Sequence, residues 1–228
     1  MKKPLIILTG PTAVGKTAAS IGLAKAVNGE IISADSMQVY RTMDIGSAKI
    51  TREEMDGVPH HLVDVLDPEE EFNVVRFQQM AKKAMEGIYD RGKIPVIVGG
   101  TGFYIQAVLY DIDFTENDGN PAYRIELEQI AAEKGPEYLH EELKKIDPKS
   151  AEDIHAHNVK KVIRALEFYR QTGQQISEHN AKEREKVAPY HSAYFVLTDE
   201  RTALYDRIDR HVDLMMKQGL LDEVRMLK

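Results

Sequence analysis

The segment LIILTGPTAVGKTAAS, residues 5–20, places an apolar run directly before a glycine-rich loop that contains a lysine. Residues 10–17 have the pattern G-x-x-x-x-G-K-T, in which the glycines allow a tight turn whose backbone N–H groups point at a phosphate. We predict a phosphate-binding loop, called the glycine loop below, made by Gly10, Pro11, Thr12, Ala13, Val14, Gly15, Lys16 and Thr17. Lys16 adds a positive charge and the Thr17 hydroxyl is the predicted ligand of Mg²⁺. The pattern does not identify the molecule that carries the phosphates.

Polar residues also follow two other apolar runs. Asp35 comes directly after residues 30–34, and Thr101 lies among three glycines after residues 95–98. Because ligands collect at the carboxyl ends of strands in open parallel sheets, we expect both residues to face the glycine loop. Alternatives stay open at both positions: Asp35 could simply cap the next turn, and the glycines around Thr101 could form a tight turn instead of admitting a substrate.

These residues need a scaffold that brings strand ends together. Short apolar runs alternate with helix-like stretches at residues 5–8, 30–34, 61–66, 95–98 and 194–197. Alternation of this kind predicts an α/β fold, in which a P-loop parallel sheet has helices on both faces. Residues 1–112 are the predicted first part of this core, residues 113–189 an all-helical insertion without strand-like runs, and residues 190–228 the return to the core. Because residue 228 lies inside an amphipathic pattern, we expect a longer native protein.

Composition limits the classes of function. The chain of 228 residues has 30 basic and 37 acidic residues and a formal net charge of −7, which argues against a surface that binds nucleic acid everywhere. It has no cysteine, which excludes disulfides, thiolate metal sites and cysteine nucleophiles and favours the cytoplasm. No run approaches the roughly 20 apolar residues of a membrane span. None of the eight histidines has a recognised ligand spacing, so we assign them no metal.

One region is locally basic. Residues 157–186 contain seven Lys or Arg and four Glu. An apolar stripe at helical spacing is formed by Val159, Val162, Ile163 and Leu166. The stripe leaves three basic residues on the opposite side of the predicted helix, namely Lys160, Lys161 and Arg164. Binding of a phosphate backbone is the functional interpretation, and a solvated helix face is the alternative.

Five ordered stretches resemble the motifs of the tRNA dimethylallyltransferase family, also called isopentenyl-pyrophosphate tRNA transferases. They are GPTAVGKT at 10–17, SADSMQVYRTMDIGSAK at 33–49, HHLVDVLDP at 60–68, VGGTGFY at 98–104 and VIRALEFYRQTG at 162–173. The resemblance covers nearly the whole chain. The stretches at 33–49 and 98–104 are specific to the family, whereas the glycine loop alone indicates only a P-loop protein.

The resemblance implies transfer of a dimethylallyl group from dimethylallyl diphosphate to N6 of the adenosine on the 3′ side of the tRNA anticodon. The glycine loop would hold the diphosphate, with Mg²⁺ on Thr17. Asp35 is the implied proton acceptor, and Thr101 and Arg124 complete the implied catalytic set. The implied tRNA contacts are Asp35, Ser36, Met37, Gln38, Thr101, Arg124, Lys160, Lys161 and Arg164. We expect a cytoplasmic monomer whose insertion, residues 113–189, binds tRNA.

The local sequence around Arg124 agrees with an anionic partner. Asn120 and Pro121 predict the start of a helix, which places Arg124 in its first turn. A cation there opposes the helix dipole, and an anion bound nearby would compensate for it. A solvated surface arginine is the alternative.

Two other classes of function compete with the transferase. A P-loop kinase for a nucleotide or small metabolite would also place an acidic residue after the second strand, but such kinases usually have an arginine-rich lid. A nucleotide-dependent switch would need a base-recognition motif and switch segments, and we find neither in the sequence.

Overall fold

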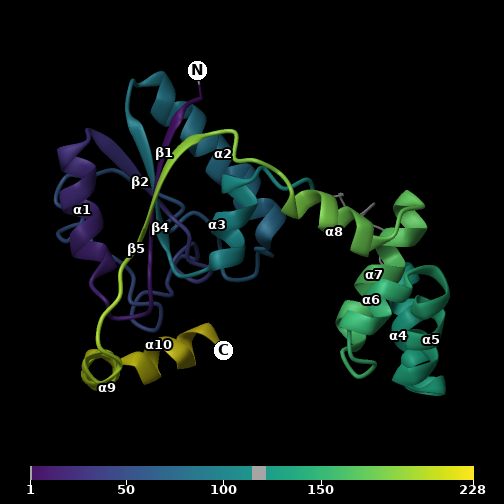
Figure 1. The fold of residues 1–228 in the computed structure, drawn as a ribbon. Coiled ribbons are helices and arrows are strands. Elements are labelled where there is room, and N and C mark those ends of the chain that lie inside the picture. The colour runs from purple at the N-terminus through teal and green to yellow at the C-terminus, as the bar shows by residue number, and fades with distance from the viewer. Residues whose placement is uncertain (1, 115–121) are drawn as a thin grey trace. The chain divides into compact units, whose positions relative to one another are not determined.

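The computed structural model describes residues 2–114 and 122–228 (Figure 1). Its contacts divide the chain into two units. The core unit contains residues 1–112 and 188–228, and the helical unit contains residues 113–187. The predicted helix start at Asn120 and Pro121 lies outside the described residues.

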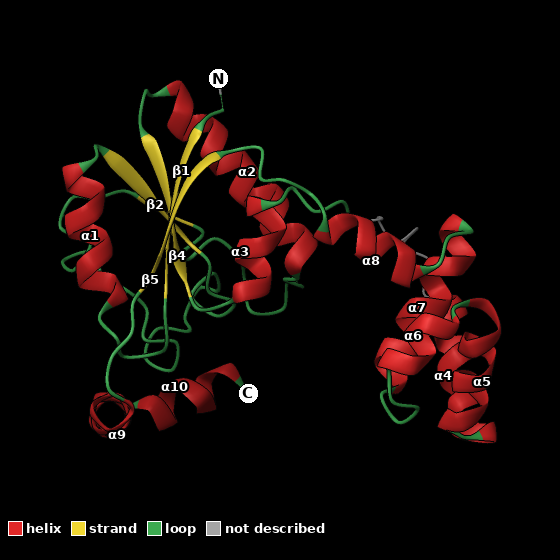
Figure 2. Cartoon of the chain, viewed as in Figure 1, coloured by secondary structure: helices red, strands yellow, loops and turns green. Residues whose placement is uncertain are grey.

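Strands and helices alternate along the core unit (Figure 2). Its elements are β1 (Pro4–Thr9), α1 (Lys16–Ala26), β2 (Gly29–Ser33), β3 (His60–His61), α2 (Val74–Asp90), β4 (Ile94–Gly99), α3 (Gly102–Leu109), β5 (His191–Val196), α9 (Arg201–Gln218) and α10 (Leu220–Leu227). Those of the helical unit are α4 (Ala122–Lys134), α5 (Pro136–Ile146), α6 (Pro148–Asp153), α7 (Val159–Thr172) and α8 (Ile176–Arg184).

The five strands form one sheet in the order β3-β2-β4-β1-β5, and every pair is parallel. This confirms the predicted α/β fold class. The strand expected at residues 61–66 is wrong beyond His61. The chain turns there because Leu62 and Asp64 have left-handed backbone angles, with φ of 63° and 56°.

Alternating side chains of the strands supply two apolar layers, one on each face of the sheet. On one face Ile31 and Val96 pack with Ala24 of α1. On the other, Ile32 and Ile97 belong to the cluster that contains most of the buried residues of α2 and α3. Figure 1 shows α1 on one side of the sheet and α2 and α3 on the other. Because successive residues of a strand point to opposite faces, apolar side chains on both faces pack the sheet between two layers of helices.

The helical unit has its own apolar core, built around Leu143, Val162 and Leu166. A buried aspartate, Asp147, ties its elements together. One of its carboxylate oxygens accepts from the Ser150 N–H at the start of α6, and the other accepts from the Ser177 N–H in α8. Because both helix starts share this acceptor, the unit is held by a buried polar contact as well as by apolar packing.

The last strand and the two helices after it contain no buried residue. Helices α9 and α10 are separate because Gly219, with φ of 102°, turns the chain between them. None of the helices in the described ranges is both long enough and apolar enough to cross a membrane.

A buried charge cluster lies where β2 and β4 begin. The Glu30 side chain is 3% exposed, and its carboxylate contacts Arg91 (2.6 Å), Lys93 (2.9 Å) and His61 (2.7 Å). Hydrogen bonds from Arg91, which outweigh the opposing effect of burial, lower the pKa of Glu30 to about 2. The cluster thus compensates a carboxylate that would be costly to bury alone.

We predict that Glu30→Gln lowers the free energy of unfolding by about 3 kcal/mol at pH 7, because the buried side chain loses its charge-assisted hydrogen bonds and ion pairs to Arg91 and Lys93. Since the folded-state pKa of Glu30 is about 2 and its ordinary value is 4.5, its stabilisation is complete above about pH 4.5 and is lost toward pH 2. Urea unfolding at several pH values, with the exposed Glu53→Gln variant as control, should show a deficit that shrinks on acidification. A deficit that is constant over this range would contradict the prediction.

Candidate active site

The glycine loop connects β1 to α1. Gly10 has φ of 150° and Gly15 has φ of 92°, conformations that a residue with a side chain rarely adopts. A Cβ on Gly10 would also lie 2.5 Å from the carbonyl oxygen of Leu197. The two glycines are therefore required by the backbone path of the loop itself.

Lys16, the first residue of α1, lies across this loop. Its Nζ donates to the carbonyl oxygens of Gly10 (2.9 Å) and Pro11 (2.7 Å). Burial lowers the pKa of Lys16, and the Asp35 carboxylate opposes that effect by charge attraction. Lys16 and Asp35 therefore share one electrostatic environment, although β1 and β2 are separated by a helix in the sequence.

Asp35 follows β2 and is partly exposed. Its Oδ1 accepts hydrogen bonds from the backbone N–H groups of Met37 (2.8 Å) and Gln38 (3.2 Å). This is the turn-capping arrangement. Both bonds end on Oδ1, so capping the turn does not occupy Oδ2. Of the neighbouring predicted contacts, Ser36 is partly exposed and Met37 is 45% exposed.

Thr101 follows β4 and is the residue before α3. Its hydroxyl makes no capping hydrogen bond to that helix. A Cβ on Gly99 would lie 2.3 Å from the Ala34 carbonyl oxygen, so this glycine allows the ends of β4 and β2 to approach. A Cβ on Gly100 would have no neighbour closer than 3.9 Å. The space around the backbone is therefore open at Gly100 and closed at Gly99.

The order of the strands brings these three segments to one edge. β4 lies between β2 and β1, with Val98 paired to Ser33 and Gly99 paired to Thr9. Because the strands are parallel and end at matching positions, the segments that carry Asp35, Thr101 and the glycine loop leave the sheet at the same edge. A polar edge with one lysine and one carboxylate can hold an anion and accept a proton.

The oxygen atoms at this edge suit Mg²⁺. Thr17 is exposed in the first turn of α1, next to Lys16. Mg²⁺ prefers oxygen ligands and commonly takes one or two from the protein while the rest come from phosphates and water. Within residues 2–114 and 122–228, no three His, Cys, Asp or Glu side chains form a metal-binding group. The Thr17 hydroxyl is thus an oxygen atom of the type that Mg²⁺ prefers.

The remaining predicted residues belong to the helical unit. Arg124 donates from Nε and Nη2 to the two carboxylate oxygens of Glu167, at 3.0 and 2.8 Å. Glu167 is buried on α7, so the pair fixes the guanidinium of Arg124. Lys160 and Lys161 are exposed and Arg164 is partly exposed. The roles of these four basic residues stay predictions.

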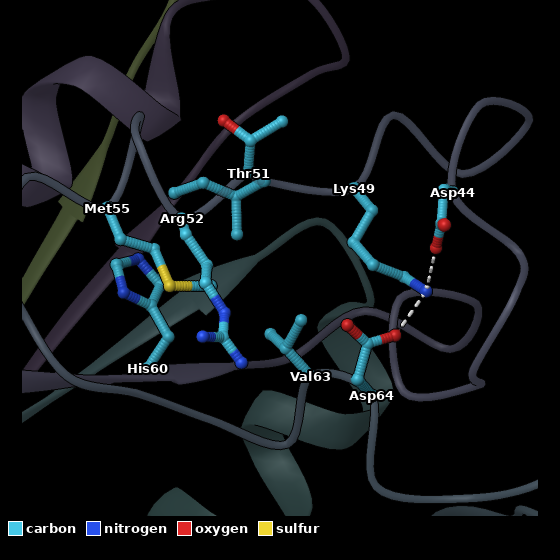
Figure 3. A pocket seen from close by; sticks show the side chains of 9 residues that line it. Asp44, Lys49, Thr51, Arg52, Met55, His60, Val63 and Asp64 are labelled. Carbon is cyan, nitrogen blue, oxygen red and sulfur yellow. Dashed lines mark hydrogen bonds and ion pairs between the residues drawn. The ribbon is translucent and has the colours of Figure 1, made fainter.

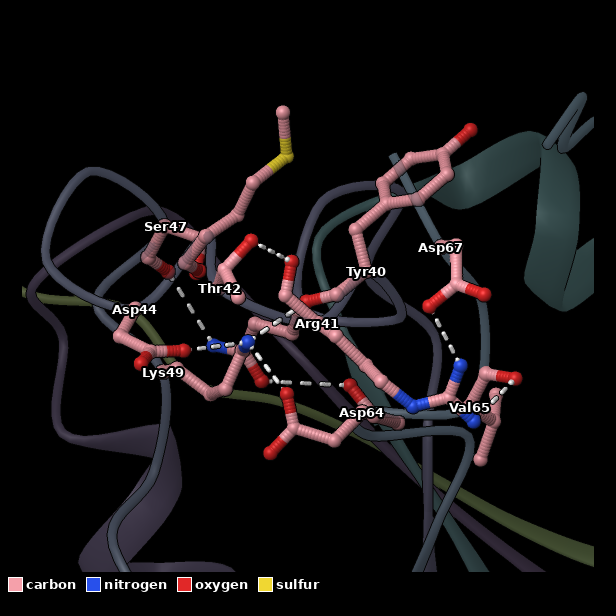
Figure 4. A network of polar contacts seen from close by, with 12 residues as sticks. Tyr40, Arg41, Thr42, Asp44, Ser47, Lys49, Asp64, Val65 and Asp67 are labelled. Carbon is pink, nitrogen blue, oxygen red and sulfur yellow. Dashed lines mark hydrogen bonds and ion pairs between the residues drawn. The ribbon is translucent and has the colours of Figure 1, made fainter. Parts of the chain in front are cut away.

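Sequence reasoning did not assign a role to Lys49, although it lies in one of the quoted motifs. The Lys49 side chain is 4% exposed, and its Nζ donates to the Tyr40 carbonyl oxygen, to Asp44 and to Asp64, at 2.5–2.6 Å (Figure 4). This lysine joins the loop after Asp35 to the segment after β3. The position of Lys49 at the end of the quoted stretch 33–49 could have indicated a role for this residue, but only the fold shows its hydrogen-bond partners.

A cleft of about 520 Å³ lies beside this network (Figure 3). Its lining includes Lys49 and Asp64, together with Arg52, Met55 and His60. Burial lowers the pKa of His60. The cleft thus offers a polar surface next to the loop that carries the predicted substrate contacts.

Comparison with known proteins identifies the family. The pattern of the family described as IPP transferase matches residues 38–228, and that described as Isopentenyl transferase matches residues 3–67. A tRNA dimethylallyltransferase of Lachnoclostridium phytofermentans is 61% identical over 226 residues, which are 99% of this chain and 72% of that protein.

Solved structures agree. The full-length tRNA isopentenylpyrophosphate transferase of Bacillus halodurans is 48% identical with a TM-score of 0.68, and the match covers 100% of this chain and 70% of that one. A eukaryotic dimethylallyltransferase, captured acting on tRNA, is 34% identical with a TM-score of 0.88 over 99% of this chain and 56% of that one. With one family pattern matched over most of its length and such relatives over nearly all of it, the chain belongs to the IPP transferase family, the family of the tRNA dimethylallyltransferases.

Proposed function

We propose that this protein transfers a dimethylallyl group from dimethylallyl diphosphate to N6 of the adenosine on the 3′ side of the tRNA anticodon. Family membership supports this reaction. The observation that carries the proposal is the common sheet edge at which β1, β4 and β2 end, because it places the glycine loop with Lys16 and the Asp35 turn at the ends of neighbouring parallel strands. No observation favours the kinase alternative.

In this reaction the bond between C1 of the donor and its diphosphate oxygen breaks, and a bond between C1 and N6 of adenine forms. The electron pair leaves with diphosphate, whose growing charge the glycine-loop N–H groups and Lys16 stabilise. Adenine N6 loses a proton, which Asp35 accepts. Thr101, between these two groups in strand order, supplies a polar contact near the reacting atoms.

Mg²⁺, held through Thr17 and the diphosphate, would neutralise negative charge on the leaving group. Lys16 must release the carbonyl oxygens of Gly10 and Pro11 to bind the diphosphate. Since these are neutral acceptors, a charged diphosphate competes with them successfully.

The helical unit is proposed to bind the tRNA backbone through Lys160 and Lys161 on α7, with Arg164 beside them. The buried residues of α7 hold the helix on the unit's core and leave the two lysines exposed. A tRNA substrate also implies the cytoplasm as the place of action. The role of Arg124 in the reaction and a monomeric state stay predictions from the resemblance.

We predict that Lys16→Ala reduces dimethylallyl transfer by at least about 10²-fold, the effect of removing one donor to a developing oxyanion. The melting temperature should change little because the hydrogen bonds that the structure describes for the Lys16 ammonium group go to two carbonyl oxygens of its own loop. Lys83→Ala, which removes an exposed lysine of α2, is the matched control. Wild-type turnover by Lys16→Ala at saturating dimethylallyl diphosphate would exclude the assignment.

We expect Asp35→Asn to lower the single-turnover rate by roughly 10²–10⁴-fold, the usual contribution of a general base. The asparagine oxygen can still accept from Met37 and Gln38, so the turn and the tRNA affinity should be kept. Rate and tRNA binding are measured on one preparation, beside the exposed Asp90→Asn control. A rate within a few-fold of wild type would leave Asp35 only its turn-capping role.

For the tRNA surface, the double variant Lys160→Glu, Lys161→Glu should weaken tRNA binding and reduce the slope of log Kd against log salt by about 1 for each lost phosphate contact. Donor binding should stay unchanged. The double variant Lys144→Glu, Lys145→Glu makes the same charge change on α5 of the same unit. Equal salt dependence of the two double variants would show that α7 is only a solvated face.

A further inference from the structure

Helix α10 presents a carboxylate to the loop that follows the Asp35 turn. Glu223 Oε2 accepts from the backbone N–H groups of Asp44 (2.8 Å) and Ile45 (2.7 Å), and Oε1 accepts from Gly46 (2.8 Å). Glu223 is 179 residues from Asp44 in the sequence. The contact is close, since a Cβ on Gly46 would lie 3.2 Å from Leu220 and 3.4 Å from Glu223.

The three N–H groups belong to a single turn that needs an acceptor from outside. Two of its carbonyl groups are used within the turn, because the N–H groups of Ala48 and Lys49 donate to the oxygens of Ile45 and Asp44. The N–H groups at the start of such a turn have no partner within it. Glu223 supplies the acceptor, and as a carboxylate it makes stronger bonds than a neutral group would.

The other end of the turn holds Gln38. The Gln38 side-chain amide donates to the carbonyl oxygens of Ser47 (3.3 Å) and Ala48 (3.2 Å). The Gln38 backbone N–H donates to Asp35 Oδ1 at 3.2 Å. A continuous path of hydrogen bonds therefore leads from Glu223, through residues 44–48, to Gln38 and the Asp35 carboxylate.

We propose that Glu223 is a positioning residue for the transfer reaction: it holds the turn at residues 44–48, and through it the Gln38 amide, in place beside Asp35. The proposal rests on the proposed function for its kinetic part only. A merely structural Glu223 would instead fasten α10 to the rest of the core unit, and its loss would lower stability without a selective effect on tRNA use.

The test compares Glu223→Ala and Glu223→Gln with Asp222→Asn, which removes an exposed charge from the same turn of α10. Hydrogen exchange reports the contact directly and does not require activity. In Glu223→Ala the amides of residues 44–46 should exchange at least about 10-fold faster, the scale of one hydrogen bond to a charged group, while those of residues 5–20 stay unchanged. Glu223→Gln, which keeps one acceptor oxygen, should be intermediate.

Steady-state kinetics test the consequence. We expect kcat/KM for tRNA to fall about 10-fold in Glu223→Ala, with KM for dimethylallyl diphosphate within about twofold of the Asp222→Asn control. In a Gln38→Ala background the Glu223→Ala change should add little, because both changes disturb the same path.

The outcomes are separable. If the wild-type protein transferred no dimethylallyl group, the proposed function would be overturned. Hydrogen exchange at residues 44–46 would then still decide whether Glu223 holds the turn. Unchanged exchange at residues 44–46, additive effects with Gln38→Ala, or a loss of transfer explained by a lower melting temperature would each overturn the positioning role.

Discussion

Backbone hydrogen bonds between parallel strands are the constraint on which the candidate site depends. They hold β2, β4 and β1 in a register that places Ser33, Val98 and Thr9 near one edge. Each loop that follows then starts from a fixed point, so Lys16 and Asp35 can interact without any direct link between their segments. Apolar layers on both faces keep the sheet in this arrangement.

The sheet separates two kinds of charge. Where β2 and β4 begin, the Glu30 carboxylate is buried, and its charge is compensated by Arg91, Lys93 and His61. This cluster is expected to contribute to the stability of the fold. At the opposite ends of the strands the charged groups of Asp35 and Lys16 are partly exposed, and are available to substrates. Because all the strands run in the same direction, the compensated charges lie at one end of the sheet and the charges available to substrates lie at the other.

The loops around the site are held by polar contacts as well as by the burial of apolar side chains such as Val39 and Leu66. Lys49 is buried among oxygen acceptors, and Glu223 accepts from the first three N–H groups of the turn at residues 44–48. Burial acts to raise the pKa of Glu223, but the three backbone hydrogen bonds together have the larger effect, so the pKa lies below its ordinary value. The carboxylate therefore stays charged while it accepts these bonds. Such contacts fix direction as well as distance, which a substrate-binding loop requires.

The sequence alone determined the alternation of strands and helices, the glycine loop and the residues after each strand, because these depend on local periodicity and on backbone freedom at glycine. It predicted residues 61–66 as a strand and was wrong beyond His61, where left-handed residues end the pairing. Only the tertiary structure decided that β4 lies between β2 and β1, that Gly99 serves strand packing, and that Glu223 reaches Asp44. The physical reason is that these contacts join segments far apart in the chain, and no local pattern of residues encodes which distant backbone group a side chain will meet.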